Sequence, residues 1–422
     1  MSLDVFDVKN ILVNVTLNDT VSSTVTLHMN NETYVINVTD GFGQLAVENL
    51  AYDNYTALAE FEEEGYFRSN ASGEIELRLI NTYINSSDVV MYYHDGTRFA
   101  AGLFDENNNA LSNQSVIFSI NNVNYTRTTD ENGLASIAIN LVSNNYTVGI
   151  IFNGTDIYRG FSHNWNLTVL STLSGKDVTK YYRNNTQYYV ALYDSEGNAM
   201  ANQNVSMNIN GVFYNRTTNE SGVARLNINL NPGTYILTAL NPVTGEQMSN
   251  TIVVLSRIVE NHDLVKHFRN DSQYYLKILD NQGNPLEQRT VKFNINGVFY
   301  YRESDENGLV RLNINLGPGT YILTAMYDGY AVSNNITVLP TIQSDDLEMS
   351  YKDGSTFNAT LLDSVGQPAV NKSVIFNING VFYNRTSDAQ GIAHLNINLM
   401  SGEYIITSTY EGLSVSNRIT IH

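Results

Sequence analysis

A six-residue segment that returns along the chain constrains the fold more than any other feature of the sequence. Residues 209–214 read Ile-Asn-Gly-Val-Phe-Tyr, and the same six residues return at 295–300 and 378–383. A weaker copy occupies residues 120–125, and a more diverged one lies further upstream. The second turn residues of these copies are separated by 91, 89, 86 and 83 residues; they are Asn31, Asn122, Gly211, Gly297 and Gly380. This period exceeds that of helical solenoid repeats and indicates a tandem array of small domains.

The last copy of the repeat indicates what each domain is. Apolar residues alternate with polar ones in the segments 347–351, 357–361, 374–378 and 395–399. Such alternation gives a strand one buried and one exposed face. Asn379-Gly380 is a strong signal for a two-residue hairpin turn, in which both positions take positive φ. Seven short strands per unit, with no persistent 3.6-residue apolar period, predict an all-β fold: a tandem array of five immunoglobulin-like (Ig-like) Greek-key β-sandwiches.

Domain boundaries are expected after the last apolar strand of each unit. This places the units at residues 1–79, 80–170, 171–255, 256–340 and 341–422, the first of them diverged. No Gly/Ser-rich or Pro-rich spacer separates them, so short linkers should join them into a semi-rigid string. With strands of about ten residues at about 3.3 Å each, five units would reach on the order of 200 Å. We expect an elongated stalk that is a piece of a longer protein.

A tyrosine follows a small turn near the start of the sixth strand of each unit. The five residues are Tyr55, Tyr146, Tyr235, Tyr321 and Tyr404. Their placement predicts a tyrosine corner, in which the phenol hydroxyl bonds to backbone upstream. A tyrosine that simply packs at the start of a strand explains the same pattern.

Charge and composition exclude several classes of protein. Lys and Arg number 23 against 42 Asp and Glu, which gives a formal net charge of −19. Since no basic run is available to neutralise a phosphate backbone, no nucleic-acid partner is expected. The chain has no Cys, which rules out disulfides and thiolate sites and suits an exported protein. Neither a signal peptide nor an 18-residue apolar run is recognisable, so membrane contact is expected only through flanking regions.

One stretch of the third unit carries a resemblance to a known family. Residues 211–222 read Gly-Val-Phe-Tyr-Asn-Arg-Thr-Thr-Asn-Glu-Ser-Gly, with Leu-Asn-Ile-Asn-Leu at 226–230 and Asn-Pro-Val-Thr-Gly-Glu at 241–246. This resembles the bacterial-Ig-like repeats of adhesin-like surface proteins from methanogenic archaea, closely from residue 80 onward and loosely before it. At the level of the fold it is also similar to the stalks of intimin and invasin. The resemblance implies display on the cell surface and a role in attachment, and it implies no catalytic residue.

The first strand of each unit has an unusual residue on its apolar side. The middle position of this strand is Met91 in the second unit and Met349 in the fifth, but Lys180 and Lys266 in the two units between them. A fully buried Lys needs a partner, because burying an ammonium alone costs several kcal/mol.

The last strand offers such a partner in both of these units. Its inward position is Asn250, Asn334 and Asn417 in units three to five and Trp165 in the second. Lys facing Asn beside a protonated Asp is the arrangement of intramolecular isopeptide bonds in surface pilins and adhesins, since a dry core raises an Asp pKa and lowers a Lys pKa. The two candidate sets are Lys180, Asn250 and Asp194, and Lys266, Asn334 and Asp280. Asp105 and Asp363 hold the same place in units without Lys, so turn capping, an ion pair or a Lys that snorkels from the strand end explains these residues as well.

No cofactor is expected, with calcium between units as the one candidate. Glu260 with Asp263, and Asp345 with Asp346, lie near junctions and are also explained as solvated surface charge. The turns at 130–133, 305–308 and 388–391 fit hairpin turns better than calcium loops, because they lack alternating oxygen ligands. The acidic run 60–64 is interpreted as a solvated loop first and a partner or cation contact second.

Two further expectations concern modification and catalysis. Asn-x-Ser/Thr sequons are dense, and we expect a few to carry glycans in the native host, although an Asn- and Thr-rich composition also produces them by chance. Examples are Asn14, Asn18, Asn37, Asn54, Asn113, Asn145, Asn166, Asn204, Asn215, Asn270, Asn335, Asn358 and Asn384. No enzyme is expected, because no histidine recurs at one site, no catalytic motif is present and no cleft-forming insertion interrupts the units.

These observations predict a stalk fragment of an extracellular, surface-anchored adhesin, which projects and supports a binding element. Its partner would be a glycan or protein of a host or neighbouring cell. The first alternative is that the units bind directly, through the diverged first unit or exposed tyrosines such as Tyr214, Tyr300 and Tyr383. The second is an accessory domain of a surface hydrolase, for which a cleft with paired carboxylates would be the signature.

Overall fold

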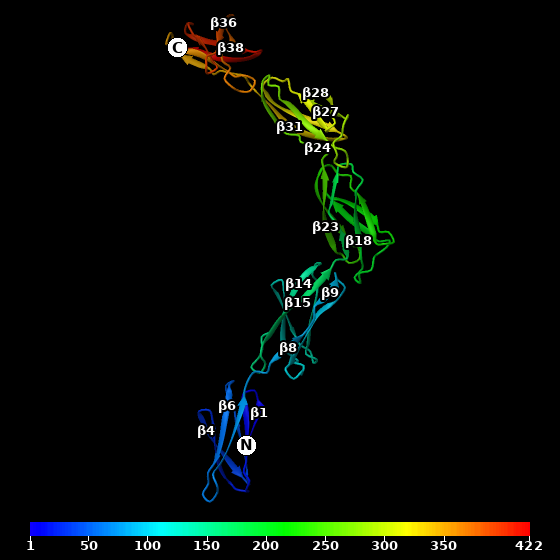
Figure 1. Cartoon of the computed structure of the whole chain (residues 1–422), viewed down its shortest axis with the longest axis vertical. Helices are drawn as coiled ribbons and strands as arrows, with labels where there is room; N and C mark the ends of the chain where they lie inside the picture. Colours follow the sequence, from blue (N-terminus) through cyan, green and yellow to red (C-terminus); the bar gives the residue numbers. More distant parts are fainter.

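The computed structural model is an elongated string of β-domains (Figure 1). It describes the backbone of residues 1–422 and the side chains of all residues except 6 and 7. The described chain contains 39 strands and no helix, and so none that is long and apolar enough to cross a membrane. The tandem all-β fold that the repeats predict is confirmed. We number the units 1 to 5 along the chain.

Unit 2 shows the topology that units 2 to 5 share. Its strands are β8 (Thr82–Asn85), β9 (Val89–Tyr92), β10 (Arg98–Asp105), β11 (Ser115–Ile120), β12 (Val123–Thr128), β13 (Leu134–Ala138), β14 (Asn144–Phe152) and β15 (Phe161–Leu170). Three form one sheet in the order β13-β10-β8, and five form the other in the order β12-β11-β14-β15-β9. β8 pairs antiparallel with β10 whereas β9 pairs parallel with β15. The first strand therefore divides between the two sheets, and each of units 2 to 5 has eight strands where the sequence predicts seven.

Units 3 to 5 repeat this pair of sheets. Unit 3 contains β16 (Leu173–Gly175), β17 (Val178–Tyr181), β18 (Gln187–Leu192), β19 (Asn204–Ile209), β20 (Val212–Thr217), β21 (Val223–Asn227), β22 (Gly233–Leu240) and β23 (Gln247–Leu255). Unit 4 contains β24 (Ile258–Val259), β25 (Leu264–His267), β26 (Gln273–Ile278), β27 (Thr290–Ile295), β28 (Val298–Glu303), β29 (Leu309–Asn313), β30 (Gly319–Tyr327) and β31 (Tyr330–Leu339). Unit 5 contains β32 (Ile342–Gln343), β33 (Leu347–Met349), β34 (Thr356–Leu361), β35 (Ser373–Ile378), β36 (Val381–Thr386), β37 (Ile392–Asn396), β38 (Gly402–Tyr410) and β39 (Leu413–Ile421).

The predicted hairpin turns are present between the third and fourth long strands of these units. In unit 5, Asn379 and Gly380 have φ of 49° and 78°, and the corresponding Asn-Gly pairs of units 3 and 4 are also left-handed. Unit 2 uses Asn121 and Asn122 in the same conformation. Two consecutive positive φ values define the tight turn whose twist matches the flanking strands, so this turn fixes the hairpin register.

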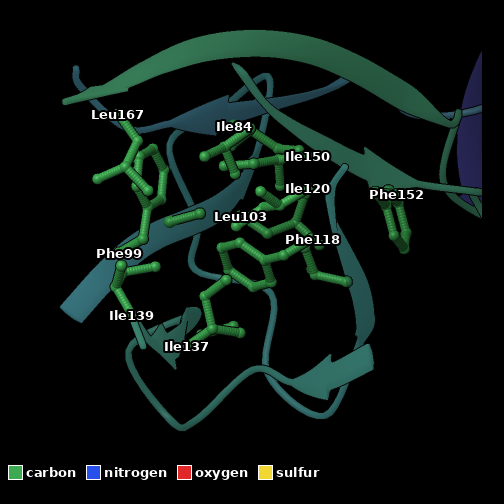
Figure 2. Packing of buried hydrophobic residues seen from close by; sticks show 14 of the residues in the cluster. Ile84, Phe99, Leu103, Phe118, Ile120, Ile137, Ile139, Ile150, Phe152 and Leu167 are labelled. Carbon is green, nitrogen blue, oxygen red and sulfur yellow. The ribbon is translucent and has the colours of Figure 1, made fainter. Parts of the chain in front are cut away.

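Each sandwich closes around its own apolar core, which Figure 2 shows for unit 2. Phe99 and Ile137 point inward from the three-stranded sheet, and Phe118, Ile150 and Leu167 from the five-stranded sheet. All five are 0–2% exposed. Alternation along the strands supplies these residues, because every second side chain points to the same face of the sheet.

Unit 1 differs from the sandwich that the sequence predicts. Its strands are β1 (Ser2–Asp7), β2 (Asn10–Thr16), β3 (Ser23–Met29), β4 (Glu32–Thr39), β5 (Phe42–Val47), β6 (Asn54–Phe61) and β7 (Ser69–Glu76). They form one seven-stranded sheet in the order β1-β2-β5-β4-β3-β6-β7. The sheet rolls around its core, so that Gly73 of β7 lies against Leu3 of β1, where an added Cβ would be 2.9 Å from the Leu3 side chain. The physical reason is that β1 turns directly into a hairpin with β2 and does not divide between two sheets.

Candidate functional site at the junctions between units

The junction between units 3 and 4 is formed by the last residue of β17 and the residues that follow it. The ring of Tyr181 lies against the turn at Gly283, where an added Cβ would be 2.5 Å from the ring. Gly283 has φ of +93°, so a side chain at this position would be strained as well as blocked. Asn184 donates from Nδ2 to the carbonyl of Asn281 in the same turn, at 2.7 Å. Two consecutive units are thus in direct contact through a ring and a hydrogen bond.

Two arginines complete this junction from different sides. Arg183 of unit 3 forms an ion pair with Asp328, in the turn between β30 and β31 of unit 4. Arg257, at the start of unit 4, pairs with the second oxygen of the same carboxylate. Its guanidinium also lies over the Tyr327 ring at 5.3 Å and donates to the Leu279 carbonyl at 2.9 Å. Arg257 is 9% exposed, whereas the Asp328 side chain is 31% exposed, so this ion pair is only partly shielded from water and salt.

The junction between units 4 and 5 repeats the same contacts. His267 takes the place of the tyrosine and lies against Gly366, where an added Cβ would be 2.4 Å from the imidazole ring. Asn270 donates to the Ser364 carbonyl at 2.7 Å, and Arg269 approaches Glu411 to 4.0 Å. A ring, an amide and an arginine at the end of one unit therefore dock on the same two turns of the next.

The junction between units 2 and 3 keeps one part of this pattern and replaces the rest. Tyr92 lies against Gly197, where an added Cβ would be 2.4 Å from the ring. In place of the arginine contact, the carboxylate of Glu246 accepts the backbone N–H and the hydroxyl of Thr172 at 2.6 and 2.7 Å. Ser143 of unit 2 donates to the other Glu246 oxygen. This junction is held by a 6% exposed carboxylate whose partners are neutral donors.

The junction between units 1 and 2 is made by the linker itself. Arg78 donates to both oxygens of Glu106, at 2.9 and 2.7 Å, and Asn81 donates to the same carboxylate at 2.8 Å. The Arg78 hydrogen bond holds the pKa of Glu106 below its ordinary value. Tyr52 of unit 1 also donates to the Asp156 carbonyl of unit 2. The pair fixes the linker but lacks the docked ring of the later junctions.

Lys180 and Lys266 are buried as predicted, but backbone carbonyls are their partners. Lys180 donates from Nζ to the Ile228 carbonyl at 2.9 Å and the Thr186 carbonyl at 3.3 Å. Lys266 repeats these bonds with the Ile314 and Ser272 carbonyls at the same distances. Burial lowers the pKa of both ammonium groups. Each Lys is therefore buried at one end of its core, with its ammonium group hydrogen-bonded to backbone carbonyls.

The structure does not bring the proposed cross-link partners together. Lys180 lies opposite Val254 on β23, and Asn250 is four residues away along that strand, which is roughly 13 Å. Asn250 accepts from the Tyr188 hydroxyl at 2.7 Å, and Asn334 accepts from Tyr274 at the same distance. Lys266 is displaced from Asn334 in the same way, since it lies opposite the second residue after Ile336. We therefore expect an intact mass without loss of ammonia.

Asp194 and Asp280 do not serve as the protonated acid that a cross-link needs, because their carboxylates cap turns. Asp194 accepts the backbone N–H groups of Glu196 and Asn198 at 2.9 and 2.8 Å, and Asp280 does the same with the equivalent residues of its turn. The backbone N–H of Asn198, followed by its side-chain amide, lowers the pKa of Asp194, and the backbone N–H of Asn284 lowers that of Asp280. These carboxylates cap the turns that dock on the preceding unit, which is the alternative that the sequence offered.

The five tyrosines at the starts of the sixth strands share one geometry. Each hydroxyl donates to the backbone carbonyl four residues upstream, which is the geometry of a tyrosine corner. The bonds are Tyr55 to Ala51 (2.9 Å), Tyr146 to Val142 (2.6 Å), Tyr235 to Asn231 (2.8 Å), Tyr321 to Gly317 (2.9 Å) and Tyr404 to Met400 (2.8 Å). Even the differently folded unit 1 keeps this device.

The acidic residues near the later junctions bond within their own units. Asp263 accepts the backbone N–H of Asn335, and Asp346 that of Arg418, both at 2.8 Å. Glu260 lies 3.7 Å from the ammonium of Lys277. Among the described residues, no group of three or more His, Asp or Glu side chains is placed to hold a metal ion. These contacts give no support to calcium between the units.

The sequence predicts three exposed tyrosines as candidates for direct binding, but the more exposed aromatic residues are their neighbours in the chain. Tyr214, Tyr300 and Tyr383 are half-buried and pack against the cores of their units. One residue earlier, a phenylalanine points to solvent in each of the same units: Phe213, Phe299 and Phe382. The period of two decides which residue is outward, and this strand lies at the edge of its sheet, where both faces are partly open.

Comparisons with known proteins give similarity of architecture only. No protein-family model matches the chain, and no curated protein matches its sequence. Three similar solved structures are a Ca2+-stabilised adhesin that helps an Antarctic bacterium bind ice (14% identity, TM-score 0.18, 82% of this chain and 100% of that one), the I9–I11 tandem of titin (17%, 0.23, 59% and 98%), and a 1.5-MDa bacterial ice-binding adhesin (14%, 0.20, 62% and 99%). TM-scores this low identify no function.

Proposed function

We propose that this chain is an extender segment of a cell-surface adhesin, outside the cell, which holds a binding element away from the surface. The observation that carries the proposal is the recurring junction: a ring, an amide and an arginine of one unit dock on the same two turns of the next. Contacts of this kind resist bending, because a change of angle would separate them. The resemblance to adhesin-like repeats of archaeal surface proteins supports the same role.

We also propose that the chain is not an enzyme. In support, the turn aspartates use their oxygens to accept backbone N–H groups, and the donors lower their pKa values. Ionised carboxylates held in this way are poor general acids at neutral pH.

Small-angle X-ray scattering of the full chain tests the extender role. We expect a rod whose largest dimension is on the order of 200 Å, from about 35–40 Å per unit. Replacing Arg183 and Asn184 together by Ala should shorten the mean dimension and broaden its distribution, because junction 3–4 loses the Arg183–Asp328 ion pair and the Asn184 hydrogen bond.

Unit 5 supplies the matched control for this experiment. Lys352 holds the position of Arg183, with φ of 57° against 60°, and unit 5 is the last unit within the 422 residues that the experiment uses. Lys352→Ala should therefore leave the scattering profile unchanged. A compact wild-type particle, or equal shortening in the control, would refute the proposal.

A further inference from the structure

One edge of each five-stranded sheet presents side chains that recur at matching positions. β12, β20, β28 and β36 are outermost and pair only with the strand before them, so their other side faces solvent. On three of these edges a phenylalanine is exposed at one register: Phe213 by 71%, Phe299 by 48% and Phe382 by 68%. Unit 2 has Asn124 there instead. Lys292 lies over the Phe299 ring at 4.0 Å, and none of the three rings packs in a core. Exposed rings that recur at one position suggest contact with another molecule.

An arginine is fixed three residues after each of these positions. The guanidinium groups of Arg216, Arg302 and Arg385 lie over the preceding half-buried tyrosine rings, at 5.8, 5.9 and 5.8 Å from the ring centres. Each also donates from Nη1 to the carbonyl of the residue before it, at 2.8, 2.7 and 2.8 Å. Arg127 of unit 2 makes the same backbone bond at 2.7 Å. One ring and one carbonyl hold the cation in a single orientation.

The edge arginines carry a positive charge that no ion pair neutralises, on a chain of net charge −19. Arg78, Arg183 and Arg257 form ion pairs with carboxylates. By contrast, no carboxylate among the described side chains lies within ion-pair distance of the four edge arginines. A fixed guanidinium with free N–H groups is a favourable partner for a carboxylate from outside the molecule.

The backbone contact also decides between two kinds of acidic partner. Counted from the hairpin turn, Asn215 is at a non-hydrogen-bonded position, so its carbonyl points away from β19. Arg216 covers this carbonyl, which an added peptide strand would need. The arrangement therefore disfavours an acidic peptide that extends the sheet. It leaves room for a ligand that uses side chains alone.

We propose that the edges formed by β20, β28 and β36 bind an acidic polysaccharide, a linear polymer of uronic acids. The guanidinium donates hydrogen bonds to a carboxylate of the polymer, and the exposed phenylalanine contacts the apolar side of a sugar ring. One such edge occurs per unit, so a long polymer can engage several, and the sites reinforce one another. This binding lies along the shaft and is independent of the extender role, which scattering tests separately.

The test measures binding of the full chain to alginate, with neutral dextran and poly-glutamate as comparison polymers. We expect the wild type to bind alginate, less tightly as salt rises, and to bind neither comparison polymer appreciably. The triple variant Arg216→Gln, Arg302→Gln, Arg385→Gln should weaken alginate binding by about tenfold or more, because every engaged site loses its cation. Phe213→Ala, Phe299→Ala, Phe382→Ala should also weaken it, with the thermal unfolding profile unchanged in both.

A second triple variant serves as the charge-matched control. Arg225, Arg289 and Arg418 are exposed and lie one in each of the same units, and no carboxylate among the described side chains is within ion-pair distance of them. Changing these three to Gln lowers the net charge equally and should leave alginate affinity within about twofold. Absence of alginate binding, equal loss in this control, or equal binding of poly-glutamate would each overturn the proposal.

Discussion

Units 3 and 5 have the same strand order, yet they fill one end of their cores with different chemistry. Unit 3 buries Lys180 and Tyr188, whereas unit 5 buries Met349 and Phe357 at the corresponding places. Unit 4 has Lys and Tyr at these positions, as unit 3 does, and unit 2 has Met and Phe, as unit 5 does. Lys occurs together with Tyr, and Met occurs together with Phe. We therefore treat each pair as one set of residues that can replace the other set.

Units 3 and 5 also differ at a small residue on the first strand. In unit 3 the Tyr188 hydroxyl donates to Asn250, and a Cβ on Gly175 would lie 2.4 Å from that hydroxyl. In unit 5, where Phe357 has no hydroxyl, Ser344 stands at the Gly175 position and donates to the equivalent Asn417. One hydrogen bond to the Asn is kept, and its donor moves from one strand to another. This comparison shows that inward-facing polar residues can hydrogen-bond to one another without forming a reactive site.

The largest expected effect comes from removing the Lys side chain of unit 3. Lys180→Ala should lower the free energy of unfolding of this unit by about 3 kcal/mol, because it leaves a cavity and two uncapped carbonyls. Lys180→Met should change it by less than about 1 kcal/mol, since the unit 5 core holds Met at this place. Amide hydrogen exchange of peptides from residues 173–255, measured in the full chain, gives both values.

Met349→Ala in unit 5 is the control for cavity formation alone. If Lys180→Met cost as much as Lys180→Ala, the ammonium itself would be required, and the two sets would not be interchangeable.

A smaller effect is expected from mixing the two sets. Gly175→Ser should destabilise unit 3 by about 1–3 kcal/mol, because the new side chain meets the Tyr188 hydroxyl. Adding Tyr188→Phe should restore most of the loss, since the serine can then donate to Asn250 as Ser344 does to Asn417. A double-mutant cycle on hydrogen-exchange stabilities measures this coupling. Additive effects of the two substitutions would contradict the proposed exchange of donors.

Much of the fold could be predicted because the decisive signals are local. Alternation marks the strands, and Asn-Gly pairs such as Asn379-Gly380 mark the hairpins together with their register. Unit 1 shows the limit: its strands alternate equally well, but alternation does not say which strand will be the neighbour of which. A sandwich and a rolled single sheet therefore have the same local pattern.

The candidate site shows the same limit at the level of single residues. Alternation correctly places Lys180 and Asn250 on inward faces but gives no position along the neighbouring strand. The parallel register, with Lys180 opposite Val254, separates them, and only the paired strands determine that register. The junction had a visible signal in the recurring Asp-x-x-Gly turns, whose glycines at 283 and 366 accommodate a ring from the unit before.

The smallest expected effect is a difference in the pH dependence of stability between units with Lys and Tyr and units with Met and Phe. It appears only at alkaline pH. Burial raises the pKa of Tyr188 to about 12, so its protonated form stabilises unit 3 up to about pH 10 and this contribution is lost between about pH 10 and 12, where the unfolded state ionises first. Burial lowers the pKa of Lys180, so below about pH 10.4 the unfolded state holds the extra proton and stability rises with pH. Unit 3 should therefore gain stability towards pH 10 and lose it above.

Urea unfolding of the full chain between pH 8 and 12, compared with the variant Lys180→Met, Tyr188→Phe, measures this difference. The variant carries the unit 5 residues at both positions, so it should lose both the rise and the fall attributed to these groups. Tyr188→Phe alone should remove the fall above pH 10 and keep the rise below it, because the two groups titrate in different windows. If the double variant kept the same alkaline profile as the wild type, neither buried group would control the pH dependence of unit 3, and the chemical difference between the two cores would have no energetic consequence.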